Sequence, residues 1–256
     1  MSARVATLMF HALVTETQAQ SAQSTAEAFY SLPGDRFRTC LQLIDDQCLP
    51  TLTTRELGQV DAGVAITFDD GWETDYTVAF PELLSRRMRA ISFVITDWIG
   101  KSGFMSAAQL REMARQGMDV QVHGKTHRFL ADLPEIELRL ELSTAKARLE
   151  DILGQEVTAL SYPGGRGGSR ERLIAGELGY RHFFSSRPGW YRGSGVEIPR
   201  MVVHQGTSIA DIEHYLAGRA GPVFRQSARY YLGRTLRKFL GSERYNRLKS
   251  NGQRGG

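Results

Sequence analysis

Strand-like and helix-like segments alternate along almost the whole chain between residues 4 and 217. One clear example is the long amphipathic helix that Pro134 opens and Gly154 stops. Alternation of this kind predicts a parallel sheet with right-handed crossovers. At 256 residues, a closed or nearly closed α/β barrel is favoured over an open sheet. In such barrels the functional side chains gather at the carboxyl ends of the strands.

The expected elements follow from the spacing of apolar residues. Strands are expected at 4–13, 63–68, 90–96, 119–123, 160–162, 181–185 and 198–203. Helices are expected near 37–49, 73–88, 106–115, 134–153, 169–178 and 208–217.

An acidic corner, T-F-D-D-G at 67–71, ends the apolar strand-like run 63–66. Neighbouring side chains on a strand point to opposite sides, so Asp69 and Asp70 are expected to do different jobs. One carboxylate can hold a metal ion while the other handles a proton. A solvated turn accounts for the same residues, because Asp-Gly pairs are common in turns.

A second polar cluster, H-G-K-T-H at 123–127, follows another strand-like run at 120–122. Two imidazoles four residues apart can converge on one cation if the chain between them turns tightly. Histidine and carboxylate together suit Zn²⁺ or another borderline divalent ion. A histidine pair alone is more often a surface or core feature than a ligand set. Two such clusters, each at the end of an expected strand, favour a metal site.

At these residues the chain resembles the NodB-homology polysaccharide deacetylases of carbohydrate esterase family 4. The first motif of that family, T-F-D-D-G, is matched in full at 67–71. The second, H-[ST]-x-x-H, is matched at 123–127 except that Gly124 replaces the hydroxyl residue. The run L-M-F-H at 8–11 resembles the L-M-Y-H strand of the poly-N-acetylglucosamine deacetylase branch. The resemblance covers residues 4–217 and implies a distorted (β/α)7 barrel.

The resemblance also implies roles for individual residues. Asp70, His123 and His127 would be the metal ligands, and Asp69 would be the general base. Three protein ligands leave one position of a Zn²⁺ ion open, where water can be activated. Co²⁺ or a similar ion would suit the same ligands.

The third family motif, R-x-P-[YF]-G, aligns with S-Y-P-G-G at 161–165. Its proline and last glycine match, so the turn is expected to be kept, and the Gly164 N–H is the candidate oxyanion donor. The arginine that would orient the base carboxylate is replaced by Ser161. Arg166 or Arg200 could enter that space from another direction. A flexible loop accounts equally well for the glycines of this segment.

The proton donor of the family is a histidine in a late L-x-H motif, and His204 is the candidate here. The aspartate that pairs with it in the family has no counterpart between residues 182 and 196. His11 is a competing candidate, expected near the same cleft. Trp190 could form a wall on which a sugar stacks, although packed aromatic residues are the commoner case. The candidates for substrate contact are His11, Tyr162, Pro163, Arg166, Trp190 and Arg200.

Charge divides the chain into a deacetylase-like domain at 1–217 and a basic extension at 218–256. The extension holds ten Lys and Arg against one acid, whereas the rest carries a net charge of −5. Apolar and basic residues at helical spacing from 224 to 240 predict an amphipathic helix. It would suit an anionic membrane surface, or it would pack on the barrel with solvated arginines. Nucleic acid is not an expected partner, because the barrel is acidic.

The chain contains no run of 18 apolar residues and no convincing N-terminal leader. We therefore expect a cytoplasmic protein, which the basic extension could place at the inner face of the membrane.

Together these features predict a metal-dependent hydrolase that removes N-acetyl groups from N-acetylhexosamine units of an exopolysaccharide or its precursor and releases acetate. Two alternatives stay open. One is an O-acetyl esterase with the same machinery. The other is a non-catalytic carbohydrate-binding or membrane-associated protein on a degraded esterase fold, which the missing arginine and aspartate would favour.

Overall fold

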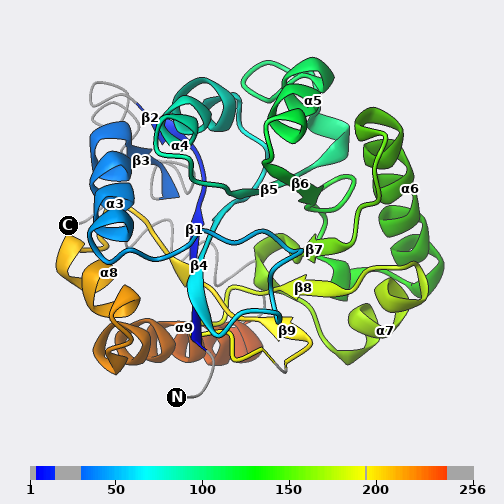
Figure 1. The fold of residues 1–256 in the computed structure, drawn as a ribbon. Coiled ribbons are helices and arrows are strands. Elements are labelled where there is room, and N and C mark those ends of the chain that lie inside the picture. Colours follow the sequence, from blue (N-terminus) through cyan, green and yellow to red (C-terminus); the bar gives the residue numbers. More distant parts are fainter. Residues whose placement is uncertain (1–3, 15–29, 194, 241–256) are drawn as a thin grey trace.

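A curved sheet of eight parallel strands forms the centre of the molecule (Figure 1). The structure, a computed structural model, describes residues 4–14, 30–193 and 195–240, with side chains described as far as residue 232. The sheet order is β10-β1-β4-β5-β6-β7-β8-β9, and the strands curl into a half-barrel. Its members are β1 (Arg4–Phe10), β4 (Ala62–Phe68), β5 (Ile91–Val94), β6 (Asp119–Val122), β7 (Ala159–Ser161), β8 (His182–Phe184), β9 (Glu197–Ile198) and β10 (Met201–Val202). A separate parallel pair consists of β2 (Leu13–Val14) and β3 (Leu32–Pro33).

Helices cover the outer side of the sheet (Figure 1). They are α3 (Gly34–Asp46), α4 (Phe80–Ser85), α5 (Ala107–Arg115), α6 (Glu135–Leu153), α7 (Ser169–Glu177), α8 (Ile209–Leu216) and α9 (Ala220–Leu240). Short turns of 3-10 helix lie at Thr96–Trp98, Leu130–Asp132 and Pro163–Gly165. The capping box expected at Ser106 and Gln109 is formed, and α6 ends at Gly154 with a left-handed φ of 67°.

Alternate residues of the strands divide between two apolar clusters. On β4, Val64 and Ile66 pack in the cluster that is shared with the helices. Ala65 packs in a second cluster, made only of strand and loop residues, on the inner side of the sheet. Because side chains alternate along a strand, Thr67 and Asp69 continue the inner row that Ala65 begins. The sheet therefore directs Asp69 into the half-barrel.

The expected strand 198–203 is wrong as a single element. It consists of β9, which pairs with β8, and β10, which pairs with β1 at the opposite edge of the sheet. The chain crosses from one edge to the other at Pro199 and Arg200. Proline has no N–H to give to a strand ladder, so the strand breaks there. As a result, Arg200 lies at the seam between the two edges of the half-barrel.

Two other expected elements differ in detail. The expected helix 73–88 contains a π-helical turn at Asp75–Ala79, after two α-helical residues, and continues as α4, with Pro81 in the first turn of α4. The expected strand 4–13 ends at Phe10, which leaves His11 in the loop that follows β1.

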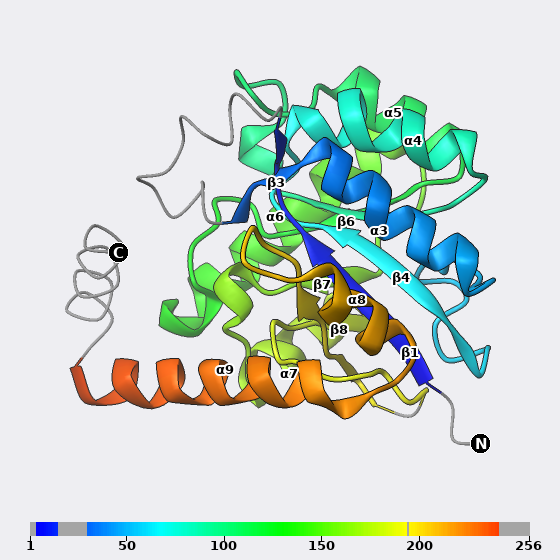
Figure 2. The same ribbon diagram turned by 90° about the vertical axis from the view of Figure 1, so that its left-hand side faces the viewer.

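The basic extension begins with a helix, as expected. In Figure 2, α9 runs along one side of the barrel and continues beyond it. Among the described helices, none has both the length and the hydrophobicity needed to cross a bilayer. Residues 241–256 lie outside the described part of the chain.

Candidate metal and active site

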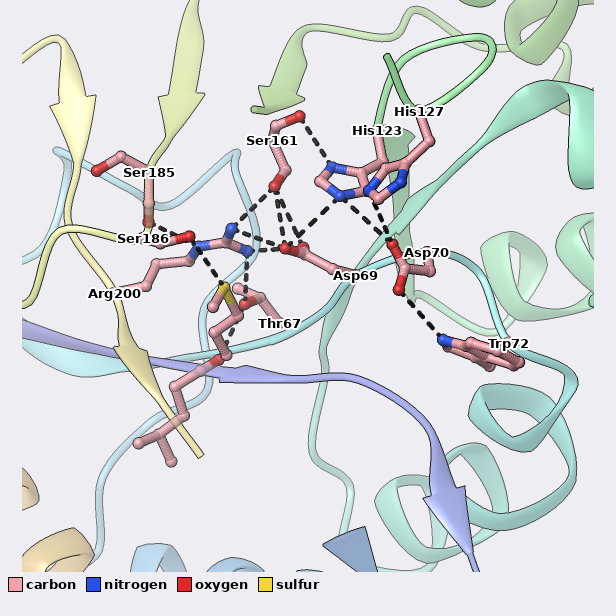
Figure 3. Close-up of polar contacts among 12 residues, drawn as sticks. Thr67, Asp69, Asp70, Trp72, His123, His127, Ser161, Ser185, Ser186 and Arg200 are labelled. Atoms are coloured by element: carbon pink, nitrogen blue, oxygen red, sulfur yellow. Dashed lines mark hydrogen bonds and ion pairs between the residues drawn. The ribbon is translucent and has the colours of Figure 1, made fainter. Parts of the chain in front are cut away.

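The acidic corner after β4 sends its two carboxylates in different directions (Figure 3). The Asp69 N–H donates to the Phe10 carbonyl at 3.0 Å, which extends the contact between β1 and β4 by one residue. Asp70 adopts a left-handed φ of 79°, so the chain turns sharply directly after Asp69. Asp69 is buried, and Asp70 is more open to solvent. The two aspartates therefore have separate surroundings, as the alternation along the strand predicts.

Asp70, His123 and His127 bring one carboxylate oxygen and two imidazole nitrogens together. The Nε2 atoms of both histidines lie 3.5 Å from Asp70 Oδ1. The ligand atoms of all three residues lie within 4.8 Å of one another. Two ligands of a tetrahedral Zn²⁺ ion are roughly 3.4 Å apart, given metal–ligand distances of about 2.1 Å. The donor set and its spacing therefore fit a divalent ion.

Neighbouring groups hold these three residues in the protonation states and orientations that bind a cation. His123 Nδ1 lies 2.9 Å from the Ser161 carbonyl, which fixes its proton on Nδ1 and leaves the Nε2 lone pair facing Asp70. Burial and the charge of His123 lower the pKa of His127 to about 4, so its ring is neutral at pH 7, the form that binds metal. The Trp72 Nε1–H donates to Asp70 Oδ2 at 3.3 Å, and Oδ1 is left for the histidines.

Glu141 of α6 holds the loop that carries the two histidines. Its Oε1 accepts the N–H groups of Lys125 at 2.9 Å and Thr126 at 2.7 Å, and the Thr126 hydroxyl lies within 3.0 Å of both carboxylate oxygens. The sequence analysis missed this residue. Its signal is an acid on the apolar face of an amphipathic helix, at the spacing of Leu138 and Leu142, where a charge needs a buried partner.

Arg200 reaches Asp69 from the seam of the half-barrel (Figure 3). Its Nη1 and Nη2 donate to Asp69 Oδ1 and Oδ2, each at 2.8 Å. Nη2 also donates to Ser161 Oγ at 2.8 Å, and that hydroxyl lies 3.2 Å from both oxygens of Asp69. Nη1 donates to Thr67 Oγ1 at 3.2 Å and Nε to the Ser185 carbonyl at 3.0 Å. All five guanidinium N–H groups therefore have an acceptor.

The expectation that Arg200 contacts the substrate is wrong, because its exposed fraction is 0%. It instead holds the Asp69 carboxylate, which is the task that the resemblance assigns to the arginine of the third family motif. Ser161, the residue that replaces that arginine, is small enough to leave room for it. Burial alone would raise the pKa of Asp69, but the charge and hydrogen bonds of Arg200 together with the nearby His123 and His11 outweigh burial and hold the pKa well below its usual range. Asp69 is thus kept ionised.

The S-Y-P-G-G segment forms the expected turn. Gly164 has a φ of 61°, and a Cβ there would lie 2.5 Å from a ring atom of Phe129, so both conformation and packing require glycine. Gly164 is exposed, whereas Tyr162 and Pro163 are buried. Tyr162 packs on Phe183 with its ring buried in the apolar core. Tyr162 and Pro163 therefore shape the turn and, contrary to expectation, offer no side chain to a substrate.

Arg166 does not reach Asp69. Its guanidinium pairs with Asp132 at 3.0 Å and lies over the ring of Phe129, 4.4 Å from the ring centroid. Of the two arginines considered for the vacant motif position, only Arg200 enters it. Contact of Arg166 with a substrate stays a prediction.

His204 follows β10 at the edge of the sheet beside β1 and is buried. Its Nδ1 accepts the N–H of Gly206 at 3.0 Å, so the neutral ring carries its proton on Nε2. The loop is held from α3, where the Arg36 guanidinium donates to the carbonyls of Gln205 and Thr207. No signal in the sequence pointed to Arg36.

His11 lies in the loop after the neighbouring strand β1. Its ring packs against Tyr30 with 4.7 Å between centroids, and its buried Nδ1 has no hydrogen-bond partner within the described part of the chain. Burial lowers the pKa of His11, although the charges of Asp70 and Asp69 act in the opposite direction. His11 is thus close enough to the two carboxylates to sense their charge.

Trp190 lies at the other end of the barrel, so the expectation of a sugar-stacking wall at this residue is wrong. Its neighbour Tyr191 bridges to Val5 near the start of β1. The Trp190 ring stacks on Tyr215 and lies beside Arg4, the first residue of β1. The carboxylates and histidines of the site, by contrast, follow the carboxyl ends of their strands.

Comparisons with known proteins indicate the family of this domain. Residues 59–183 match the family model of polysaccharide deacetylases. The chain is 28% identical over 166 residues to "Putative polysaccharide deacetylase YxkH" of Bacillus subtilis, a match that covers 62% of this chain and 60% of that protein. The chain thus spans less than two thirds of the length of this curated relative.

Solved structures share the fold. The deacetylase PplD of Streptococcus pyogenes, solved with acetate, superposes with a TM-score of 0.74 at 24% identity, over 82% of this chain and 96% of that one. IcaB from Ammonifex degensii gives a TM-score of 0.72 at 23% identity, over 84% and 98% of the two chains. These structures show the same fold, and the family match at 59–183 identifies a polysaccharide deacetylase domain of the NodB-homology type (carbohydrate esterase family 4) in this chain.

Proposed function

We propose that the chain is a metal-dependent deacetylase that hydrolyses N-acetyl groups of N-acetylhexosamine units in an exopolysaccharide or its precursor. The observation that carries this proposal is the pair of differently held carboxylates. Asp70 faces two histidines, with which it forms the candidate ligand set. Asp69 Oδ2 lies 3.9 Å from His123 Nε2, and the Asp69 carboxylate is held by the Arg200 guanidinium. The choice of N-acetylhexosamine rests on the L-M-F-H resemblance at 8–11.

Asp70, His123 and His127 would hold the ion, and we infer Zn²⁺, with Co²⁺ or a similar ion as the alternative. Because a carboxylate with a lowered pKa is a weak base, the bound ion must supply the Lewis acidity that activates water and polarises the acetyl carbonyl. Asp69 accepts the proton that the attacking water loses. Arg200 and Ser161 fix the plane of that carboxylate, so the proton moves along a set direction.

Gly164 and His204 complete the proposed reaction. The exposed Gly164 N–H is the candidate donor to the carbonyl oxygen as negative charge develops on it. His204 is the candidate source of the proton for the departing amine, and it would give that proton from its imidazolium form, because a neutral ring that lost its Nε2–H would become an imidazolate. The C–N bond of the amide breaks, water supplies the hydroxyl to the carbonyl carbon, and the products are acetate and a free amine.

Acetate release from N-acetylglucosamine oligomers tests this proposal. We expect chelation to abolish release and added Zn²⁺ or Co²⁺ to restore it. Asp69→Asn should abolish release but keep the metal, whereas Asp70→Ala and His127→Ala should lose both, with metal content measured by emission spectroscopy. Asp45→Asn, in an exposed ion pair with Arg86, is the matched control and should behave as the wild type. A fully active Asp70→Ala variant would refute the ligand assignment.

The same assay separates the alternatives. A degraded, non-catalytic fold predicts bound metal without acetate release from any glycan. Arg200 removes one of the two reasons for that alternative, because it stands in for the missing motif arginine. Release from O-acetylated but not N-acetylated glycans would leave the metal site in place and overturn the choice of bond.

A further inference from the structure

The side of α9 that faces away from the barrel is apolar. On the inner side, Val223 packs against the core and Gln226 hydrogen-bonds the backbone of β10. On the outer side, Phe224, Tyr231 and Leu232 have exposed fractions of 75%, 50% and 62%. Three large apolar side chains exposed on one face of a helix mark a surface that interacts with something else.

These residues form a stripe along the helix axis. Phe224, Ala228 and Leu232 follow one another at intervals of four residues, and Tyr231 lies beside Leu232 on the same face. Because α9 continues beyond the barrel, its outer face is open to a large flat partner (Figure 2).

The charge around the stripe indicates which partner fits. The sequence of α9 contains five Lys and Arg and no acidic residue. Arg229 lies in the exposed part beside the stripe, as does Arg225, which also pairs with Asp211 of α8. A second copy of the chain would bring two extensions of net charge +9 together, which is unfavourable. An anionic lipid surface satisfies both features, because apolar side chains enter the headgroup region while arginines meet the phosphates.

We propose that α9 docks this protein on an anionic lipid bilayer through the stripe of Phe224, Ala228, Tyr231 and Leu232. The chain lies on the surface and does not span it. This inference is independent of the proposed deacetylation, since no residue of the stripe belongs to the candidate site.

The molecule also supplies a matched control. Ile136 and Leu140 on α6 form a second exposed apolar pair, with exposed fractions of 84% and 63%. Their acidic neighbours Glu135 and Glu137 pair with Arg139 and Arg128, so this surface has no excess of positive charge that would attract anionic lipid. Replacing both of these residues by aspartate changes the net charge by the same amount as replacing two stripe residues of α9, so the two double variants can be compared directly.

The test is sedimentation of the full chain with vesicles of phosphatidylcholine alone or with about 30% phosphatidylglycerol. We expect binding only to the anionic vesicles, and weaker binding in high salt, because salt screens the arginines. The double variant Phe224→Asp/Leu232→Asp should bind at least about tenfold more weakly. Ile136→Asp/Leu140→Asp should bind as the wild type does, and both should release acetate from soluble oligomers at the wild-type rate.

Two results would overturn the proposal. One is absent binding, or equal binding to both kinds of vesicle, by the wild type. The other is a wild-type dimer in sedimentation velocity that the α9 double variant converts to a monomer, which would assign the stripe to a second copy. Neither result depends on whether the chain releases acetate.

Discussion

Arg200 is a buried charge that the surrounding residues satisfy completely. Moving a guanidinium and a carboxylate out of water costs several kcal/mol per ion. The two parallel hydrogen bonds to Asp69, and those to Thr67, Ser161 and Ser185, offset this cost. The main effect of the arrangement is therefore to hold the Asp69 carboxylate in one orientation, and stabilisation of the fold comes second.

Arg200→Lys should keep the charge but lose the two-pronged contact, because an ammonium cannot hold both oxygens of Asp69 in one plane. We expect kcat to fall by about 10- to 100-fold with bound metal unchanged.

Arg200→Met leaves the Asp69 charge without its arginine partner and should also lower the free energy of unfolding by about 3–5 kcal/mol. Steady-state kinetics and thermal melts check both. Arg181→Met, in an exposed pair with Glu156, is the control. Wild-type kcat in Arg200→Lys would show that orientation of Asp69 is unimportant.

Whether the sequence predicts that two site residues meet depends on how they are placed along the chain. Asp70, His123 and His127 lie in two short motifs at strand ends, and parallel strands bring such ends together, so their convergence was predictable. Arg200 lies 131 residues from Asp69 and in no recognised motif, so the sequence offered it only as one of two arginines. Its place depends on a strand break that an apolar run does not reveal.

At the scale of elements, α6 positions the histidine loop through a single buried acid. The Glu141 carboxylate accepts two backbone N–H groups that would otherwise be unpaired beside the candidate metal ligands. Loops that carry ligands need such support, because an imidazole displaced by a fraction of an ångström binds metal less well. The helix thus acts on the site although it contributes no ligand to it.

Glu141→Leu should weaken metal binding, because Lys125 and Thr126 lose their acceptor and the loop between the histidines relaxes. We expect the dissociation constant for Zn²⁺ to rise by about 10- to 100-fold, measured by titration of the metal-free protein. Glu137→Leu removes an exposed acid of the same helix, paired with Arg128, and should leave the constant unchanged. Equal affinities of the two variants would contradict the role of Glu141.

Helix α3 supports the His204 loop in a similar way. Arg36→Ala removes the donors to the Gln205 and Thr207 carbonyls, so His204 should lose its fixed orientation. We expect kcat to fall by about tenfold with KM and metal content little changed, and Arg36→Lys to restore part of the loss. Arg38→Ala is the control, because Arg38 lies on the same helix and forms an exposed ion pair with Glu82. A loss of stability without a change in kcat would make Arg36 purely structural.

For the whole molecule, the critical feature is how the half-barrel closes. The sheet has no ladder between β9 and β10, and the two are joined only by Pro199 and Arg200. The alternation of strands and helices predicted the parallel sheet, but not this seam, because a broken and an unbroken strand have the same apolar pattern. The seam places the Arg200 side chain inside the barrel, whereas a continuous seventh strand would have used the backbone here for ladder hydrogen bonds.

The open edge of β10 is covered by α9, which gives the basic extension a structural role besides the proposed docking. Gln226 accepts the Val202 N–H at 3.2 Å and donates to the Val202 carbonyl at 2.7 Å, as a neighbouring strand would. Gln226→Ala should lower the melting temperature by several degrees, since two hydrogen bonds contribute about 1–3 kcal/mol. Gln226→Glu should cost more, because a carboxylate would face the Val202 carbonyl. Arg229→Ala, exposed on the same helix, controls for the loss of helix surface. If both Gln226 variants melt together with the wild type and the control, α9 does not hold the edge, and the pairing of β10 with β1 is enough to keep it in place.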